Sequence, residues 1–481
     1  MAGIGFELKK LFKTNSVVQK LRGSLYASLT TIGPLILIIV TLFLMYFFLG
    51  YSDILFASKD ILASTILYVF IFSLCSTAPF NAVLSRYIAD KIYENQEQDI
   101  LPAYYSGLAF NVVFSSIFGF LFCLWEFFIG KVDAVFVFSS FCMYITLAFV
   151  FYNMLYITAI KEFKKISYSF VFGMLVALIL AVLLVKLFGV SVELSIVIGF
   201  AVGFLITGFC LCGLVRQYFK ENSRNYNEVF DYFKEHWRLF LTNTFYIFGL
   251  YVHNFVFWTS DMQIIVVKSF VSAPVYDMAT CIAMFINVSA MVIFIVEVET
   301  NFHDKYQNYC QTLMGGTGED ITYAKSAMFR SIRNEIFFTM QLQVIFTIGL
   351  FFICLLTMPF LSISGMIMTI LPTLAVAYFA IFIMYAMIIF IYYFNVYDKA
   401  MIAAAIFFGV SFIGSVFAKY LTPNLYGLGV LVGAFAGLTY AFYALRGIER
   451  NLDYYIFCKG RIAKQVIGKK YGHKIYENTV I

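Results

Sequence analysis

Long hydrophobic segments follow one another along this chain, with almost no room between them for a soluble domain. Hydrophobic residues make up 62% of the chain and charged residues only 12%, whereas soluble domains carry roughly 25% charged residues. A chain so poor in charge cannot cover its surface with polar side chains, so its solvent must be lipid. The pattern therefore predicts an integral membrane protein before any motif is considered.

The length of the hydrophobic segments predicts helices. A spanning helix needs roughly 20 mostly apolar residues, whereas a strand of a membrane barrel needs about ten residues of alternating polarity. The segments here are too long for barrel strands and do not alternate, so we expect an all-α membrane protein. About twelve spans are predicted, near residues 24–50, 61–88, 104–130, 134–160, 167–189, 193–216, 237–259, 274–298, 336–360, 364–394, 399–420 and 425–447.

The positions of lysine and arginine predict the orientation, because cytoplasmic loops carry an excess of these residues. With the N-terminus inside, the outside segments contain only five of the 33 lysines and arginines, namely Lys59, Lys131, Lys186, Lys268 and Lys419. We therefore expect both termini in the cytoplasm and an even number of spans. The basic tail then anchors to anionic lipid headgroups, and the net charge of +6 requires no nucleic-acid partner.

The predicted spans divide into two sets of six. Each set ends with a span that carries two glycines four residues apart, Gly199 with Gly203 and Gly433 with Gly437. Small residues at this spacing let helices approach closely, so the likeness indicates either similar packing faces or a duplicated bundle, and the matching positions favour duplication. The expected parts are an amphipathic cytoplasmic segment (1–23), an N-lobe (24–216), a cytoplasmic linker (217–236), a C-lobe (237–447) and a basic cytoplasmic tail (448–481).

Enzyme classes are poorly supported by the loops. The outside loops are too short for a catalytic domain, and the longest inside loop, residues 299–335, cannot build a core. No P-loop motif is present, and the glycine cluster within that loop is typical of a flexible linker. The nine cysteines contain no CxxC pair, so we expect reduced thiols, no metal site and no cofactor.

Uncharged polar residues dominate the middle of the predicted spans. Charge at mid-depth is costly and usually functional, and an ion-coupled antiporter would need a buried carboxylate there. A flippase for lipid-linked pyrophosphate sugars would need clustered basic residues. Because neither is evident, a neutral, hydroxyl-rich substrate fits better. The predicted substrate path contains Asn81, Arg86, Asp90, Asn243, His253, Asn254 and Asp277.

Several of these residues have two interpretations. Arg86 and Asp90 are four residues apart and face each other on a helix, either as a local ion pair or as one edge of a cytoplasmic gate. His253 is either a hydrogen-bonded packing residue or a group that binds a sugar hydroxyl or senses pH. Prolines inside spans make static kinks or hinges. The candidate hinge residues are Gly33, Pro34, Pro79 and Pro372.

The N-terminal sequence Met1-Ala2-Gly3-Ile4-Gly5-Phe6-Glu7-Leu8-Lys9-Lys10-Leu11 closely resembles the start of PelG-family proteins. The Gly33-Pro34 pair and the segment 86–93 also resemble that family, whereas His253-Asn254 stands where an acidic-basic pair is expected. The resemblance implies the polysaccharide-transporter branch of the MOP flippase superfamily, with two six-helix MATE-like lobes in the cytoplasmic (inner) membrane. It further implies export of a mostly neutral, N-acetylgalactosamine-rich exopolysaccharide, with a cytosolic glycosyltransferase and a cyclic di-GMP-sensing membrane scaffold as partners.

Rival functions remain open from the sequence. An ion-coupled drug antiporter of the same fold would require a titrating buried carboxylate. An integral-membrane glycosyltransferase would need acidic residues on a sizeable loop, and a non-transporting scaffold would bind synthase partners without sugar flux. Aromatic residues, 20% of the chain, can stack on pyranose rings, which favours the exporter.

Overall fold

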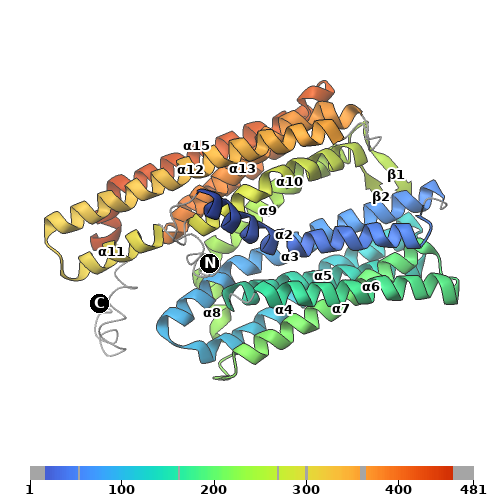
Figure 1. Ribbon diagram of the computed structural model, residues 1–481, viewed down its shortest axis with the longest axis horizontal. Helices are drawn as coiled ribbons and strands as arrows, with labels where there is room; N and C mark the ends of the chain where they lie inside the picture. Colours follow the sequence, from blue (N-terminus) through green and yellow to red (C-terminus); the bar gives the residue numbers. More distant parts are fainter. Residues whose placement is uncertain are drawn as a thin grey trace. The chain divides into compact units, whose positions relative to one another are not determined.

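The computed structural model describes residues 17–51, 55–160, 163–267, 270–297, 302–357 and 365–458. The described chain is almost entirely helical, in agreement with the predicted class (Figure 1). Its elements are α2 (Val17–Phe48), α3 (Phe56–Glu94), η2 (Glu97–Asp99), α4 (Ile100–Trp125), η3 (Glu126–Gly130), α5 (Ala134–Ile160), α6 (Phe163–Phe188), α7 (Val192–Tyr218), α8 (Glu228–Glu235), α9 (Trp237–Phe257), β1 (Ile264–Val267), β2 (Phe270–Ser272), α10 (Pro274–Glu297), α11 (His303–Gly315), α12 (Gly318–Thr357), α13 (Gly365–Tyr393), α14 (Tyr397–Ala418), η6 (Pro423–Leu425), α15 (Leu428–Asp453) and η7 (Tyr454–Cys458).

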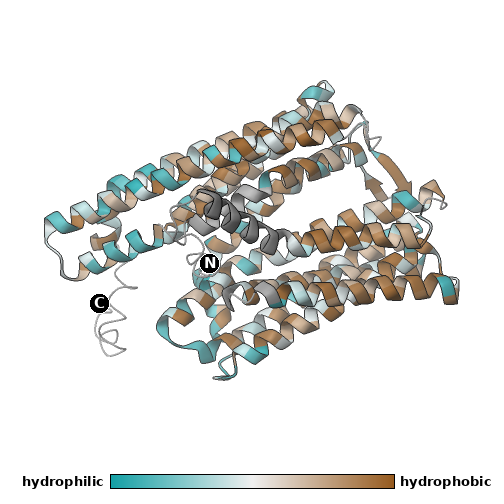
Figure 2. Cartoon of the chain, in the orientation of Figure 1, coloured by the Kyte–Doolittle hydropathy of each residue, from teal (hydrophilic) through white to brown (hydrophobic). Residues whose placement is uncertain are grey.

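The helices are apolar enough to place the protein in a membrane. Among the described residues, nine helices are long and apolar enough to span a bilayer, and Gly33–Phe48 of α2 is a shorter apolar helix. Hydrophobic residues dominate the helices, whereas hydrophilic ones gather in the hairpin of α11 and α12 and at the turns (Figure 2). The prediction of a multi-pass helical membrane protein is confirmed, while the number of spans and the side of the termini stay predictions.

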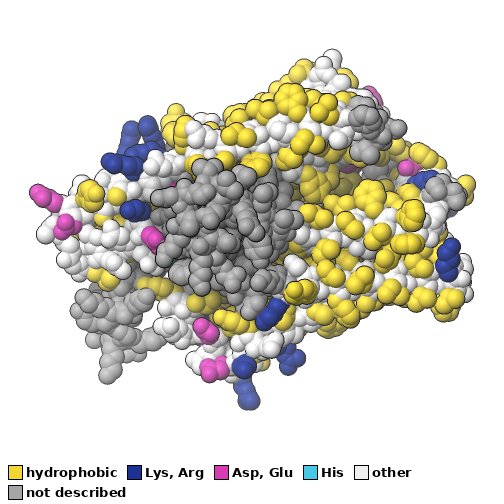
Figure 3. Space-filling view, in the orientation of Figure 1, with side chains coloured by type: hydrophobic (Ala, Val, Ile, Leu, Met, Phe, Trp, Pro, Cys, Tyr) yellow, Lys and Arg dark blue, Asp and Glu magenta, His cyan; other side chains and the backbone are white. Residues whose placement is uncertain are grey.

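The chain forms two compact units, one containing Ser28–Asp277 (unit 1) and one containing Met278–Ile481 (unit 2). On the visible face of unit 1, hydrophobic side chains cover the helices and charged ones lie at the margins (Figure 3). The prediction assigned α9 to the C-lobe, whereas this division places α9 in unit 1 with the helices before it. The two lobes with a boundary at residues 217–236 therefore stay a prediction.

The paired glycines lie where helices come close within each unit. A Cβ added at Gly203 would lie 2.6 Å from the Cβ of Ala177 on α6. A Cβ added at Gly433 would lie 2.1 Å from the Oγ of Ser411 on α14. Glycine at these positions therefore permits α7 to pack on α6 and α15 to pack on α14.

Two segments expected to be loops contain regular structure. Residues 299–335, the longest predicted inside loop, are occupied mostly by α11 and the first half of α12, with the glycine cluster at the turn between these helices. The 40 residues of α12 make a helix about 60 Å long, roughly twice the hydrocarbon thickness. The predicted outside loop 260–273 contains the antiparallel pair β1–β2, in which Ile265 faces Val271.

Candidate functional site

Three predicted path residues, His253, Asn254 and Asp277, meet between α9 and the first turn of α10, all within unit 1. The Nδ1 atom of His253 lies 2.9 Å from the hydroxyl of Tyr276, and both side chains are fully buried. The Nδ2 group of Asn254 donates to Oδ1 of Asp277 at 2.7 Å. The hairpin β1–β2 reverses the chain between these helices, which is why residues 23 positions apart come together.

Asp277 holds the corner between α9 and α10. Besides Asn254, its carboxylate accepts hydrogen bonds from Nε1 of Trp258 at 3.0 Å and from the backbone N–H of Ala273 at 3.1 Å. Hydrogen bonds from three donors to this one buried carboxylate fix the elements that carry the donors. The side-chain oxygen Oδ1 of Asn254, in contrast, is buried without a hydrogen-bond partner among the described residues.

A second contact links α9 to α3 beside a proline. The Nδ2 group of Asn243 donates to the backbone carbonyl of Ala78, the residue before Pro79. Asn81, one turn further along α3, has a buried side-chain oxygen that finds no hydrogen-bond partner in the described part of the chain. The predicted path residues Asn81 and Asn243 therefore lie on helices that pack together, at the position of a predicted hinge.

The remaining hinge candidates lie inside continuous helices. Gly33 and Pro34 belong to α2, Pro79 to α3 and Pro372 to α13, and none of these prolines ends its helix. A Cβ added at Gly33 would meet no atom within 4 Å, so close packing does not explain the glycine. The hinge role stays a prediction.

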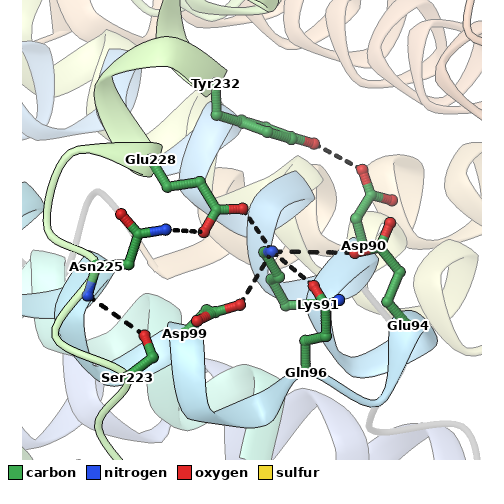
Figure 4. Close-up of polar contacts among 9 residues, drawn as sticks. All are labelled: Asp90, Lys91, Glu94, Gln96, Asp99, Ser223, Asn225, Glu228 and Tyr232. Atoms are coloured by element: carbon green, nitrogen blue, oxygen red, sulfur yellow. Dashed lines mark hydrogen bonds and ion pairs between the residues drawn. The ribbon is translucent and has the colours of Figure 1, made fainter. Parts of the chain in front are cut away.

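The predicted pair of Arg86 and Asp90 is an ion pair at the end of α3. The Nε atom of Arg86 lies 3.1 Å from Oδ1 of Asp90, with the two side chains 23% and 29% exposed. The hydroxyl of Tyr232 on α8 also donates to Oδ2 of Asp90 at 2.7 Å (Figure 4). Helical spacing predicted the pair, but the tyrosine comes from the linker and could not be foreseen.

Next to this pair, Lys91 is the centre of a cluster that the sequence analysis missed (Figure 4). Its Nζ atom lies 2.5 Å from Glu228 of α8, 3.1 Å from Asp99 and 3.9 Å from Glu94, and donates to Gln96 at 2.8 Å. We call these five residues the Lys91 cluster. Glu228 is far away in sequence, so no local pattern signals the contact. The cluster fastens the linker helix α8 to the end of α3.

The linker also buries a histidine. The ring of His236 stacks on that of Tyr232 with the centroids 4.0 Å apart, and its Nδ1 lies 3.1 Å from the Tyr232 carbonyl oxygen. Burial lowers the pKa of His236 below its ordinary value, because the charged ring is poorly solvated there. The ring is therefore neutral at physiological pH.

Unit 1 contains a cavity of about 540 Å³ between α3, α4, α5, α9 and β2, which we call the aromatic cavity. Eleven of its lining residues are phenylalanine or tyrosine. Glu126, 4% exposed, is the charged residue among the described lining. No asparagine or glutamine lines this cavity among the described residues.

The structure also buries several carboxylates. Glu126, Asp277 and Glu335 are each no more than 7% exposed. Hydropathy indicates how far a residue lies from the middle of a span. It does not indicate whether neighbouring helices bury a residue near the end of that span. The absence of a buried carboxylate was the argument against an ion-coupled antiporter, and that argument no longer holds.

Comparison with known proteins identifies the fold. The chain is similar to an outward-facing multidrug resistance MATE family transporter of the MOP superfamily (13% identity, TM-score 0.55, covering 91% of this chain and 99% of that one). It is also similar to the Vibrio cholerae MATE transporter VcmN in the bent form (12% identity, TM-score 0.56, 93% and 99%). A MOP superfamily transporter from Pyrococcus furiosus gives 11% identity, a TM-score of 0.56 and coverages of 91% and 99%.

At such low identities these structures show the fold alone, which is that of MOP-superfamily membrane transporters. Among curated proteins, none matches the chain in sequence. One family covers nearly its whole length: PelG, described as "Putative exopolysaccharide Exporter (EPS-E)", matches residues 1–457. Family and fold together point to a membrane transporter, and the chain belongs to the PelG family.

Proposed function

We propose that this chain exports a mostly neutral, N-acetylgalactosamine-rich exopolysaccharide across the cytoplasmic (inner) membrane. The family supports an exopolysaccharide as the substrate, and the fold supports a transporter. Synthesis by a cytosolic glycosyltransferase provides the polymer, and a cyclic di-GMP-sensing membrane scaffold joins the two proteins.

The proposal of a neutral substrate rests on the side-chain amides of Asn81 and Asn254. Each has a side-chain carbonyl oxygen that is buried and makes no hydrogen bond to the described residues. A buried acceptor without a donor costs about 1–3 kcal/mol, so each of these two oxygens is stabilised when a ligand supplies a donor. Hydroxyl and acetamido N–H groups of an amino sugar are donors of this kind, and they carry no charge.

The charged residues Arg86 and Asp90 fit the cytoplasmic end of the proposed substrate path. The pair of Arg86 and Asp90 is partly exposed at the end of α3, where a polymer leaving a cytosolic enzyme would first meet the transporter. In this proposal His253, Asn243 and Asp277 shape the path by holding α9 against the first turn of α10 and against α3. Gly33 and Pro34 in α2, with Pro79 and Pro372, allow the helices to bend.

The test measures secreted polymer after substitution of Asn81. Asn81→Leu keeps the side-chain size but removes the acceptor, so we expect secretion to fall at least tenfold with unchanged protein in the membrane. Asn334→Leu, on an exposed position of α12, is the matched control and should secrete normally. Asn81 is a cleaner probe than Asn254, whose amide also binds Asp277.

The assay is run in cells that contain the cognate glycosyltransferase, with polymer measured separately inside and outside the cell. Polymer retained inside the Asn81→Leu cells indicates that export is blocked and synthesis is not. Normal secretion by Asn81→Leu, His253→Ala and Asn254→Ala together would remove these residues from the path.

A second candidate, ion-coupled antiport of small molecules, is favoured by the buried carboxylates of Glu126 and Asp277. It predicts that purified protein in vesicles moves protons or sodium ions against a small organic substrate. Glu126→Gln would abolish that exchange, while polymer secretion would persist. Vesicles that show no cation flux with any test substrate would exclude it.

A further inference from the structure

We propose that the aromatic cavity of unit 1 is a binding site for one hydrocarbon chain of a membrane lipid. The site is separate from the predicted path residues, since none of them lines the cavity among the described residues. Four observations carry the proposal: the chemistry of the wall, the state of its hydroxyl groups, the shape of the cavity and its opening.

The wall is apolar and rich in rings. Its phenylalanines and tyrosines come from α3, α4, α5, α9 and β2, together with aliphatic side chains such as Ile61 and Val69. Its volume, about 540 Å³, lies within the roughly 300–1,000 Å³ that is usual for ligand sites. A wall of this kind offers water too few polar partners for stable binding, whereas a hydrocarbon chain makes contacts along its whole length.

The hydroxyl groups of the wall already have partners in the protein. Thr65 donates to the Ile61 carbonyl at 2.7 Å, Ser140 to the Phe136 carbonyl at 2.8 Å and Thr244 to the Phe240 carbonyl at 2.8 Å. Ser76 and Tyr68 likewise donate to backbone carbonyls, those of Ser73 and Val271. Because these donors are used, the wall has little to offer a sugar, and an apolar occupant leaves none of these five hydroxyl groups without a partner.

The cavity is long and parallel to the helices. Its lining runs from Phe114 to Glu126 on α4 and η3 and from Val132 to Tyr144 at α5, about 18 Å along each helix at ~1.5 Å per residue. One leaflet of the hydrocarbon core is about 15 Å thick, half of the ~30 Å total. The length therefore matches one extended lipid chain, with Glu126 and Thr65 towards the end where the headgroup would lie.

Two rings of α4 lie both in the cavity wall and at the surface of unit 1. Phe118 and Phe122 line the cavity and are also 56% and 37% exposed. A chain can therefore enter sideways from the bilayer between these rings, without passing through water. The surrounding lipid is the most abundant apolar ligand that such an opening meets.

Trp258 provides a fluorescent probe beside the cavity. Its ring centroid lies 4.5 Å from that of Tyr68, a lining residue, yet Trp258 itself is only 9% exposed. A full-length protein that keeps Trp258 and carries Trp125→Phe and Trp237→Phe is placed in phosphatidylcholine bilayers with or without bromine on the acyl chains. Bromine quenches tryptophan only at close range, so we expect at least a twofold loss of fluorescence in the brominated lipid.

A cavity-filling variant separates the site from the general lipid surface. Ser140→Phe places a ring inside the cavity and should restore most of the Trp258 fluorescence. Val135→Phe adds the same bulk to an exposed position of α5 and should leave the quenching unchanged. Absence of quenching in the starting protein, or quenching that survives Ser140→Phe in a protein that melts normally, would overturn the proposal.

A second measurement needs no substitution. Phosphatidylcholine with a photoreactive diazirine in the acyl chain is added to the unmodified protein, illuminated, and the labelled residues are mapped by mass spectrometry. Labelling of the buried lining residues Val69 and Cys75, each no more than 6% exposed, supports a chain inside the cavity. Labelling confined to exposed residues such as Phe43 and Phe209 would contradict it.

Discussion

Removal of the Lys91 ammonium is expected to release α8 from the end of α3. Lys91 lies 2.5 Å from Glu228 and 3.1 Å from Asp99, so Lys91→Met leaves two carboxylates facing each other. Removing one partner of a buried ion pair costs about 3–5 kcal/mol. Because the Glu228 side chain is already 33% exposed and regains water when α8 lifts, we take the lower end, about 3 kcal/mol. That loss corresponds to a roughly 100-fold larger opening equilibrium.

Amide hydrogen exchange of α8 measures this opening directly, because exchange through local unfolding follows its free energy. The matched control is Lys234→Met on the same helix, whose partner Asp231 lies at 2.9 Å with both side chains at least 75% exposed. Exposed pairs contribute little, so the control should change exchange by less than about fivefold. Equal exchange in the two variants would refute the reasoning. Adding Glu228→Gln to Lys91→Met should recover part of the protection, since it removes one of the uncompensated charges.

Three further predictions concern stability in detergent or lipid. Asp277→Ala removes the acceptor of three buried donors, and each of these hydrogen bonds contributes about 1.5–3 kcal/mol. The substitution should lower the melting temperature by several degrees. Asp261→Ala, at an exposed position, should leave the melting temperature unchanged. Burial lowers the folded-state pKa of His236. The neutral ring therefore contributes to the free energy of unfolding above pH ~6.5, and this contribution is lost as the pH falls towards the lowered pKa. His236→Gln should reduce the fall of the melting temperature over that pH range. Gly433→Ala forces a Cβ to 2.1 Å from a serine oxygen on α14, whereas a Cβ at Gly409 meets nothing within 4 Å. Gly433→Ala should therefore reduce the melting temperature through an overpacking cost of about 1–3 kcal/mol, and Gly409→Ala should not.

The class of fold follows from the sequence because the bilayer imposes simple rules on helix length and composition. Local spacing also predicted the ion pair of Arg86 and Asp90, which the structure confirms. The contacts of Asp277 and Lys91 could not be predicted, because their partners reach them through a hairpin and through the linker. Hydropathy gave no sign of the helices within residues 299–335, because segments of ordinary polar content follow no membrane rule. The roles of the path residues remain predictions until secretion is measured.

The continuity of α12 has a mechanical consequence. A single uninterrupted helix joins the turn at Gly318 to the interior of unit 2, where Gln343 donates to Asn287 of α10 at 3.2 Å. A helix of this length behaves as a stiff lever, so a protein that grips its outer arm shifts the inner arm by a comparable amount. The buried amide of Gln343 on that inner arm would convert the displacement into sliding between α10 and α12. An assembly attached to the tip thus gains leverage on the transporter without reaching into the bilayer.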